Sequence, residues 1–222
     1  MLERYRKALA STCQTLVMQV VIASEQEFAA PRVGFVIDVE GIIARVPEEA
    51  VTKGMFFNRC LSLAKDHDED ELLRAAGIEV RRFVPFAEYP WPQFVRLSVT
   101  VADAIADGRT TVGLREIGRA LFVEFADSLV GQVTFGVLRS NADRVIGLGA
   151  KAWNMTGIPG RVHSQSIADR HYRYHFVEYP AEFTETIAIG VLEGALLSCA
   201  EVPRLSFARA DAMNSIIDIR WG

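Results

Sequence analysis

The chain has 222 residues, half of them apolar, and a formal net charge of −4. This length and composition predict a globular protein with a substantial core and exclude a disordered chain. The acidic balance and the absence of a basic run disfavour nucleic acid and anionic membranes as partners. Cys13, Cys60 and Cys199 are widely spaced and odd in number, which argues against a disulfide framework and a structural zinc site.

The N-terminal region lacks the pattern of a secretory signal peptide. Its most apolar run, Leu16–Ala23, is too short to span a bilayer, so we expect a cytoplasmic protein without a membrane span. Leu2–Phe28 is compatible with one helix or with a helix that runs into a strand.

Residues 34–46, GFVIDVEGIIARV, alternate between apolar and other residues, and the pattern restarts after Gly41. This pattern predicts a hairpin with Glu40 and Gly41 at its turn. We treat residues 1–50, with a helix and a possible hairpin, as an N-terminal extension that forms one globular unit with a domain over residues 51–222.

Val51–Ala64 carries apolar residues at helical spacing and is predicted to be a helix. The run KDHDED over Lys65–Asp70 could be considered a metal site, but it lacks the glycine bend and the regular oxygen spacing of a hard-cation loop. A solvated turn is the better interpretation. Asp68 or Asp70 then caps a helix that runs to Ala76 and ends at Gly77.

Residues 78–92 contain three prolines and cannot form a long helix. The aromatic side chains of this segment either cover a cavity or pack the flank of the domain; they are Phe83, Phe86, Tyr89 and Trp91. Gln93–Ala106 is predicted to be a helix that ends at Asp107 and Gly108.

The next predicted helix begins at Thr110 or Thr111 and carries a strong apolar stripe through Phe125. We expect Gly131 to break this run. Two further helices are predicted over residues 133–138 and 142–153, and the segment NMTGIPG at residues 154–160 marks a turn-rich boundary.

The last third of the chain predicts strand, helix, strand and strand. In HYRYHF, His171, Arg173 and His175 alternate with three aromatic residues, as in a strand with one covered face. A helix follows over residues 183–199, and two short strands over 204–208 and 215–221 are joined by a polar turn. The economical fold class is α+β, with a helical N-terminal part packed on a small antiparallel sheet and a helix that crosses it.

The sequence has none of the short catalytic signatures of common hydrolases, nucleotide-binding enzymes and dinucleotide-binding enzymes. His171 and His175 on one straight strand lie about 13 Å apart, too far to share one metal ion. Cys60 and Cys199 fall on apolar helical stripes, where cysteine acts as a small hydrophobe. We favour a protein that is not an enzyme; catalysis through His171, Glu178 and His175 stays an alternative without support from spacing.

Several segments together resemble known proteins. LREIGRALFVEFADSLVGQVTFGVL, HYRYHFVEYPAEFTETIAIGVLEGALLSCA and SIIDIRW look like an uncharacterised paralogous family of small myxobacterial proteins, and KGMFFNRCLSLA, LLRAAGIEV and AEYPW fit its first half. More distantly, the same order is similar to haem nitric-oxide-binding (H-NOX) and 4-vinyl-reductase-like (V4R) ligand-binding domains, which share a fold with subunits of a vesicle-tethering (TRAPP) complex. The resemblance covers about residues 51–221.

This resemblance implies an H-NOX-like or V4R-like fold and raises haem as a cofactor. The haem-binding relatives place a proximal histidine on the helix before the sheet, but Val145–Gly157 contains no histidine. The stretch HYRYHF also fails to reproduce the spacing of their tyrosine, serine and arginine motif for the haem propionates. We therefore disfavour haem and assign no haem ligand.

The leading interpretation is a cytoplasmic, non-enzymatic sensory or adaptor domain that binds a small apolar ligand between its helices and its sheet. Arg119 and Arg173 are candidate anchors for a ligand carboxylate. The candidate walls of the site are apolar or aromatic side chains: Phe122, Phe125, Trp153, Met155, Tyr172, Tyr174 and Phe176.

The alternative is a protein-interaction or dimerisation module without a bound ligand, whose partner is a second copy of the chain or a signalling protein. Gly190 and Gly194, four residues apart on one helix, would permit another helix to approach closely. An intramolecular contact of this helix with the sheet explains the two glycines equally well.

Overall fold

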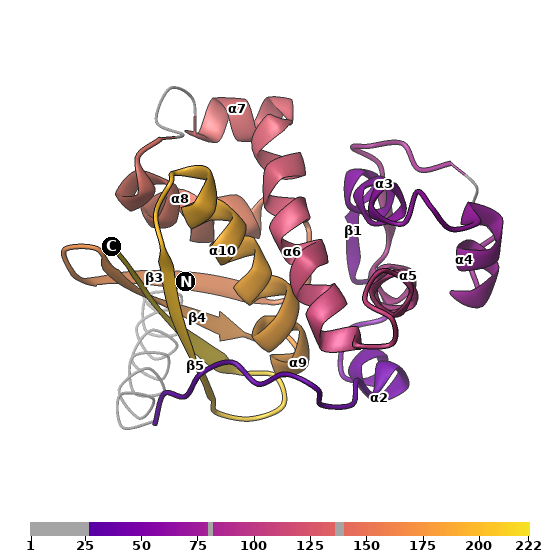
Figure 1. Ribbon diagram of the computed structural model, residues 1–222, viewed down its shortest axis with the longest axis horizontal. Helices are drawn as coiled ribbons and strands as arrows, with labels where there is room; N and C mark the ends of the chain where they lie inside the picture. Colours follow the sequence, from indigo (N-terminus) through magenta and orange to yellow (C-terminus); the bar gives the residue numbers. More distant parts are fainter. Residues whose placement is uncertain (1–26, 80–81, 136–139) are drawn as a thin grey trace, which may run out of the picture.

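The computed structural model describes residues 27–79, 82–135 and 140–222. Most of the predicted N-terminal helix, Leu2–Phe28, lies outside these residues. The described chain is α+β, as predicted, with a four-stranded antiparallel sheet in the order β3-β4-β6-β5 (Figure 1). The strands are β3 (Arg161–Ala168), β4 (His171–Val177), β5 (Pro203–Arg209) and β6 (Ser215–Trp221).

The predicted order of strand, helix, strand and strand in the last third is confirmed by β4, β5, β6 and the helical segment between them. This segment begins with α9 (Ala181–Phe183), continues through a π-helical turn, η3 (Thr184–Ala188), and ends as α10 (Ile189–Ser198). Strand β3 was not predicted. Only Val162 of its side chains is buried, so this edge strand has no apolar alternation.

Two more helices belong to the layer that covers the sheet. Helix α8 (Ala142–Asn154) lies against β3 and β4, and α6 (Thr110–Asp127) packs along α10 on the side away from the sheet (Figure 1). The apolar stripe predicted for α6 is buried, with Leu114 and Ile117 fully enclosed. These helices and β4 surround the centre of the core.

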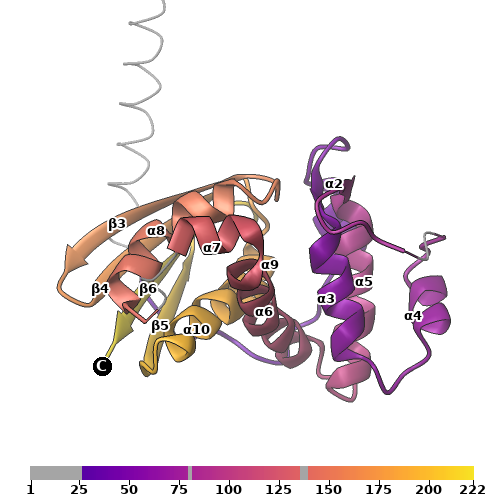
Figure 2. The same ribbon diagram turned by 90° about the horizontal axis from the view of Figure 1, so that it is seen from above.

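A second group of helices packs on the far side of α6 (Figure 2). It contains α3 (Gly54–Leu63), α4 (Glu69–Ala75) and α5 (Trp91–Ile105), together with a two-stranded sheet of β1 (Val51–Lys53) and β2 (Glu88–Pro90). The helix predicted from Val51 therefore starts three residues later than expected. Thr52 is fully buried in β1 between two half-buried neighbours, and its extended pairing with Tyr89 replaces the first helical turn.

The predicted hairpin over residues 34–46 is wrong, because Val39–Ala44 forms helix α2. The Asp38 carboxylate caps this helix by accepting a hydrogen bond from the Gly41 amide at 3.0 Å. Ile42 and Val46, four residues apart, are both buried, as the spacing of a helix allows.

The break after α6 comes at Ser128 and not at the predicted Gly131, which lies inside α7 (Leu129–Phe135). Ser128 has extended backbone angles, and its hydroxyl donates to the Phe125 carbonyl and accepts from the Gly131 amide. This serine therefore ends one helix and starts the next. The predicted helix over 133–138 overlaps the end of α7, and its last residues lie outside the described chain.

The acidic run before α4 adopts the predicted role. Asp68 caps the helix by accepting a hydrogen bond from the Glu71 amide at 3.1 Å, and Gly77 follows the helix with a φ of +68°. A left-handed backbone conformation just after a helix favours glycine, so Gly77 explains where α4 ends. The described residues contain no group of acidic, histidine or cysteine side chains arranged to hold a metal ion.

Helices α6 and α10 approach so closely that their backbones touch. A Cβ atom on Gly190 would lie 2.1 Å from the Arg115 carbonyl oxygen, and one on Gly194 would lie 2.7 Å from the Arg119 carbonyl oxygen. Both glycines therefore serve a helix contact within the chain. The buried Glu193 carboxylate joins the same two helices through hydrogen bonds from the Arg115 and Arg119 side chains, with Nε to Oε2 distances of 2.8 and 3.0 Å.

Candidate ligand-binding cavity

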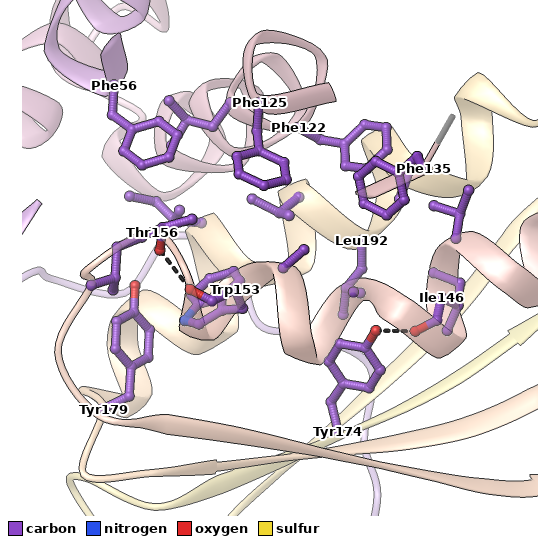
Figure 3. Close-up of a pocket in the computed structure, with 18 of the residues that line it drawn as sticks. Phe56, Phe122, Phe125, Phe135, Ile146, Trp153, Thr156, Tyr174, Tyr179 and Leu192 are labelled. Carbon is purple, nitrogen blue, oxygen red and sulfur yellow. Dashed lines mark hydrogen bonds between the residues drawn. The ribbon is translucent and has the colours of Figure 1, made fainter. Parts of the chain in front are cut away.

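A cavity lies between α6, α8, α10 and the sheet (Figure 3). The centres of water-sized molecules can occupy about 70 Å³ of it. Phe56 of α3 and Phe94 of α5 also reach its wall, so the cavity contacts both helical groups. The apolar wall on the α6 side consists mainly of aromatic rings: Phe122, Phe125 and Phe135.

These three rings form one cluster. The Phe135 ring centroid lies 5.9 Å from that of Phe122 and 6.1 Å from that of Phe125. Phe135 comes from α7 and brings this short helix onto the cavity. Aliphatic side chains complete the wall, among them Ile146 of α8 and Leu192 of α10. Such a surface binds apolar groups without orienting them.

Two tyrosines line the same cavity from the sheet side (Figure 3). The Tyr174 hydroxyl donates a hydrogen bond to the Ile146 carbonyl oxygen. A Cβ atom on Gly149 would lie 2.3 Å from this hydroxyl, so a glycine in α8 makes room for it. Burial raises the pKa of Tyr174, and the group is neutral at physiological pH.

Tyr179 lies between β4 and α9 and is 1% exposed. Its side chain packs edge-on against Trp153, with ring centroids 5.6 Å apart and planes at 89°. Within the described parts of the chain its hydroxyl has no hydrogen-bond partner. Burial raises the pKa of Tyr179, so this hydroxyl also keeps its proton.

The remaining polar groups near the cavity are oriented by local contacts. The Thr156 hydroxyl donates to the Trp153 carbonyl oxygen at 2.7 Å and keeps its capacity to accept. Among the described residues, the buried indole nitrogen of Trp153 has no hydrogen-bond acceptor, and Figure 3 shows it on the side of the indole that faces Tyr179.

A family model described as "Protein of unknown function (DUF2378)" matches residues 45–222. The chain belongs to this family. No curated protein matches its sequence significantly.

Among solved structures, this DUF2378 chain is similar in fold to several H-NOX proteins. An H-NOX protein from S. oneidensis matches with a TM-score of 0.59 at 17% identity, over 77% of this chain and 96% of that one. H-NOX proteins from K. algicida and T. tengcongensis match with TM-scores of 0.57 and 0.56 at 12% and 15% identity, over 77% of this chain and 96% and 97% of theirs. The similarity shows a common fold, as the sequence resemblance had implied.

Several residues predicted as walls of a site in the DUF2378 chain do line the cavity: Phe122, Phe125, Trp153 and Tyr174. Phe176 lies beneath them, with its ring centroid 5.3 Å from that of Trp153. Tyr172 stacks on Trp221 at 6.0 Å, away from the cavity. Met155 is 50% exposed at the end of α8.

Neither arginine predicted as a carboxylate anchor reaches the cavity. Arg119 binds Glu193 and Glu116 beside the α6–α10 contact. Arg173 is on the opposite face of the sheet, where its Nε donates to the Asp218 carboxylate at 2.9 Å. Both residues carry the positive charge that a carboxylate anchor needs. However, each side chain lies outside the cavity and is paired with a carboxylate there.

The aromatic residues of the segment before α5 do not cover the cavity. Phe83 stacks on Phe57 with centroids 4.4 Å apart, and Trp91 is fully buried against Phe183 at 5.5 Å. Phe86 is 52% exposed. The alternative interpretation, in which this segment packs the flank of the domain, describes Phe83 and Trp91 correctly.

Sequence reasoning missed Tyr179 and Phe135 as cavity residues. Tyr179 precedes Pro180 outside any periodic run, and nothing in its neighbours shows that its hydroxyl lacks a partner. Phe135 follows the misplaced helix break, so its face could not be assigned. By contrast, Leu192 lies within the helix that was predicted over residues 183–199.

A surface groove of about 270 Å³ adjoins the cavity and shares Phe122, Phe135 and Val145 with it. These three side chains therefore form a thin wall between the groove and the cavity.

The histidines of β4 do not form a catalytic arrangement. His171 contacts the Asp218 carboxylate at 2.8 Å, while His175 is buried and its Nε2 has no partner in the described chain. Burial, with Arg173 and His163 nearby, lowers the pKa of His175. No hydrogen bond joins Glu178 to either histidine among the described residues, so the structure provides no support for catalysis through these three.

Proposed function

We propose that this protein is a non-enzymatic sensory or adaptor domain of the cytoplasm that binds a small, mostly apolar, uncharged molecule in the cavity described above. The observation that carries the proposal is a cavity whose wall, made of core residues, is almost entirely aromatic and aliphatic. Sites for small molecules are typically concave, apolar and supplied with few polar groups. Among the described residues, no helix has the length and hydropathy needed to cross a membrane.

The charge of the wall decides the class of ligand. Among the described residues, no arginine, lysine or histidine lines the cavity, and both candidate anchors, Arg119 and Arg173, are held by carboxylates elsewhere. A ligand carboxylate would lose its hydration without gaining a counter-ion, which is strongly unfavourable. Each methylene group of an apolar ligand instead gains about 0.8 kcal/mol on burial. The site therefore favours an uncharged molecule.

The titles of the similar structures describe H-NOX proteins in Fe(II) states and the redox potential of a heme. The residues of this cavity do not fit that group. Its wall, as far as the described residues form it, contains no histidine, cysteine or methionine, and no cation to pair with propionates. The space of about 70 Å³ is also far too small for a porphyrin. The likeness therefore supports a shared fold, and the wall of this cavity favours a different ligand.

A ligand in this cavity would contact both helical groups at once. Phe56 and Phe94 reach the wall from α3 and α5, while Leu192 reaches it from α10 (Figure 3). A molecule that fits one relative position of these helices better than another shifts the protein towards that position. This bridging position supports a sensory role.

The alternative, a dimerisation module that uses the glycines of α10, loses its structural basis. Gly190 and Gly194 face α6 at backbone contact distance and are not available to a second chain. Leucine at Gly194 would disturb the fold itself, so the loss of a dimer in that variant would not identify an interface.

Native mass spectrometry of the freshly purified full chain tests the proposal. We expect a non-covalent mass excess on the polypeptide, or one that appears after incubation with small uncharged hydrocarbons. Ala195→Leu, which adds atoms to the cavity wall on α10, should weaken binding about tenfold. Ala75→Leu makes the same change at an exposed position of α4 and should leave binding unchanged. Absence of any bound molecule under all these conditions would refute the proposal.

A further inference from the structure

Two tyrosines on one cavity differ in what their hydroxyls do. Tyr174 donates its proton to the Ile146 carbonyl oxygen and has completed its main hydrogen bond. Tyr179 is also 1% exposed, but no hydrogen bond joins its hydroxyl to another group of the described residues, and the hydroxyl oxygen is not among their fully buried unpaired atoms. Figure 3 shows this hydroxyl directed towards the cavity, at the end where Thr156 lies.

A buried hydroxyl without a partner costs stability, and proteins rarely keep one without a reason. A water molecule at this end would find the Thr156 and Tyr179 hydroxyls in an otherwise aromatic and aliphatic wall, and a ligand acceptor that pairs with Tyr179 would take its place. Thr156 offers one lone pair nearby, since its own proton is donated to the Trp153 carbonyl oxygen. The unpaired hydroxyl is thus a donor that an occupant of the cavity can use.

We propose that Tyr179 is the polar anchor of the cavity and that the ligand is an uncharged molecule with an apolar body and one hydrogen-bond acceptor, such as a ketone or an ether. This inference rests on the proposed function and specifies its ligand. The acceptor pairs with the Tyr179 hydroxyl at the Thr156 end of the cavity. The body extends towards Phe122 and Phe135 at the opposite end (Figure 3).

Two probes of matched shape isolate the hydrogen bond. Cyclohexanone and methylenecyclohexane share a six-membered ring and differ by an oxygen in place of a CH₂ group. Their dissociation constants are measured by calorimetry for the wild-type chain, Tyr179→Phe and Tyr174→Phe. We expect Tyr179→Phe to weaken cyclohexanone binding about three- to tenfold, the contribution of one hydrogen bond, and to leave methylenecyclohexane binding unchanged.

Tyr174→Phe is the matched control, because it removes a hydroxyl from the same cavity that is already paired within the protein. We expect it to change the binding of both probes by the same factor. Both variants should be compared by near-ultraviolet circular dichroism. Tyr179→Phe removes an unpaired group and should melt at or above the wild-type temperature. The tyrosine Raman bands of the wild-type chain provide a readout without any variant, since only the ketone should shift them.

The outcomes separate the inference from the proposed function. If Tyr179→Phe changes the affinities for both probes equally, or changes neither, Tyr179 is not the anchor, although the cavity still binds ligands. If neither probe binds the wild-type chain at millimolar concentration, both the anchor and the apolar site are overturned. A ketone-specific loss in Tyr174→Phe and not in Tyr179→Phe would overturn the assignment of the anchor alone.

Discussion

The close contact of α6 and α10 makes Gly190→Ala a sharp test of how this fold is held together. The new Cβ atom would lie 2.1 Å from the Arg115 carbonyl oxygen and 3.0 Å from the Gly118 Cα atom. Both neighbours are backbone atoms and cannot rotate away. The two helices must therefore separate by about 1 Å to restore ordinary van der Waals contact.

The expected cost follows from two opposing effects. Overpacking of a tight core contact costs about 1–3 kcal/mol, and a rigid backbone neighbour places this site at the upper end. The higher helix propensity of alanine relative to glycine offsets about 1 kcal/mol of this cost. We expect a net loss of about 2 kcal/mol in the free energy of unfolding, which for a chain of this size lowers the melting temperature by about 4–8 °C.

Urea unfolding followed by circular dichroism measures this change, and Gly147→Ala in α8 is the matched control. The nearest atom to a Cβ on Gly147 is the Tyr172 hydroxyl at 3.5 Å, an ordinary contact. This variant should gain up to about 1 kcal/mol from helix propensity. Equal stability of Gly190→Ala and wild type, or an equal loss in both variants, would refute the reasoning.

Three further predictions concern ionisable groups. Glu193→Gln weakens the hydrogen bonds that Arg115 and Arg119 of α6 donate to α10. It should lower the free energy of unfolding, measured by urea titration, by about 2 kcal/mol. An unchanged free energy of unfolding would show that these ion pairs contribute nothing to stability. Burial and the nearby charges of Arg173 and His163 lower the pKa of His175. Its contribution to stability is therefore present above its unfolded pKa of about 6.5 and is lost as the pH falls below that value. His175→Asn should reduce the fall in melting temperature between pH 6.5 and 5, and an unchanged dependence of melting temperature on pH would contradict this. Burial raises the pKa of Cys60 to about 12, so iodoacetamide at pH 8 should leave Cys60 unmodified in the folded chain and modify it in urea, as peptide mass spectrometry would detect.

Local patterns were sufficient for several elements. The alternation of His171 to Phe176 predicted β4, and the expected order of strand, helix, strand and strand in the last third is confirmed. Residues 34–46 were misread because the cap by Asp38 and the burial of Ile42 outweigh an alternating pattern. Strand β3 escaped prediction because its stability comes from hydrogen bonds to β4 and not from its side chains.

The cavity could be predicted only in part. Phe122, Phe125, Trp153 and Tyr174 were identified as aromatic residues on the correct faces, and the DUF2378 and H-NOX similarities agree with the fold that their order implied. Whether these residues leave a space between them depends on the distance between α6, α8 and the sheet. That distance results from the packing of all the elements together and not from any one segment.

The sequence by itself therefore determined the α+β class, most helices and the apolar character of the residues that face the core, because these depend on local spacing and burial. Only the tertiary structure decided where charge and hydrogen bonds go. Arg119 and Arg173 donate hydrogen bonds to carboxylates outside the cavity, whereas the Tyr179 hydroxyl at the cavity has no partner among the described residues. The reason is physical: the partner of a polar group is chosen by atoms that come close in space from distant parts of the chain.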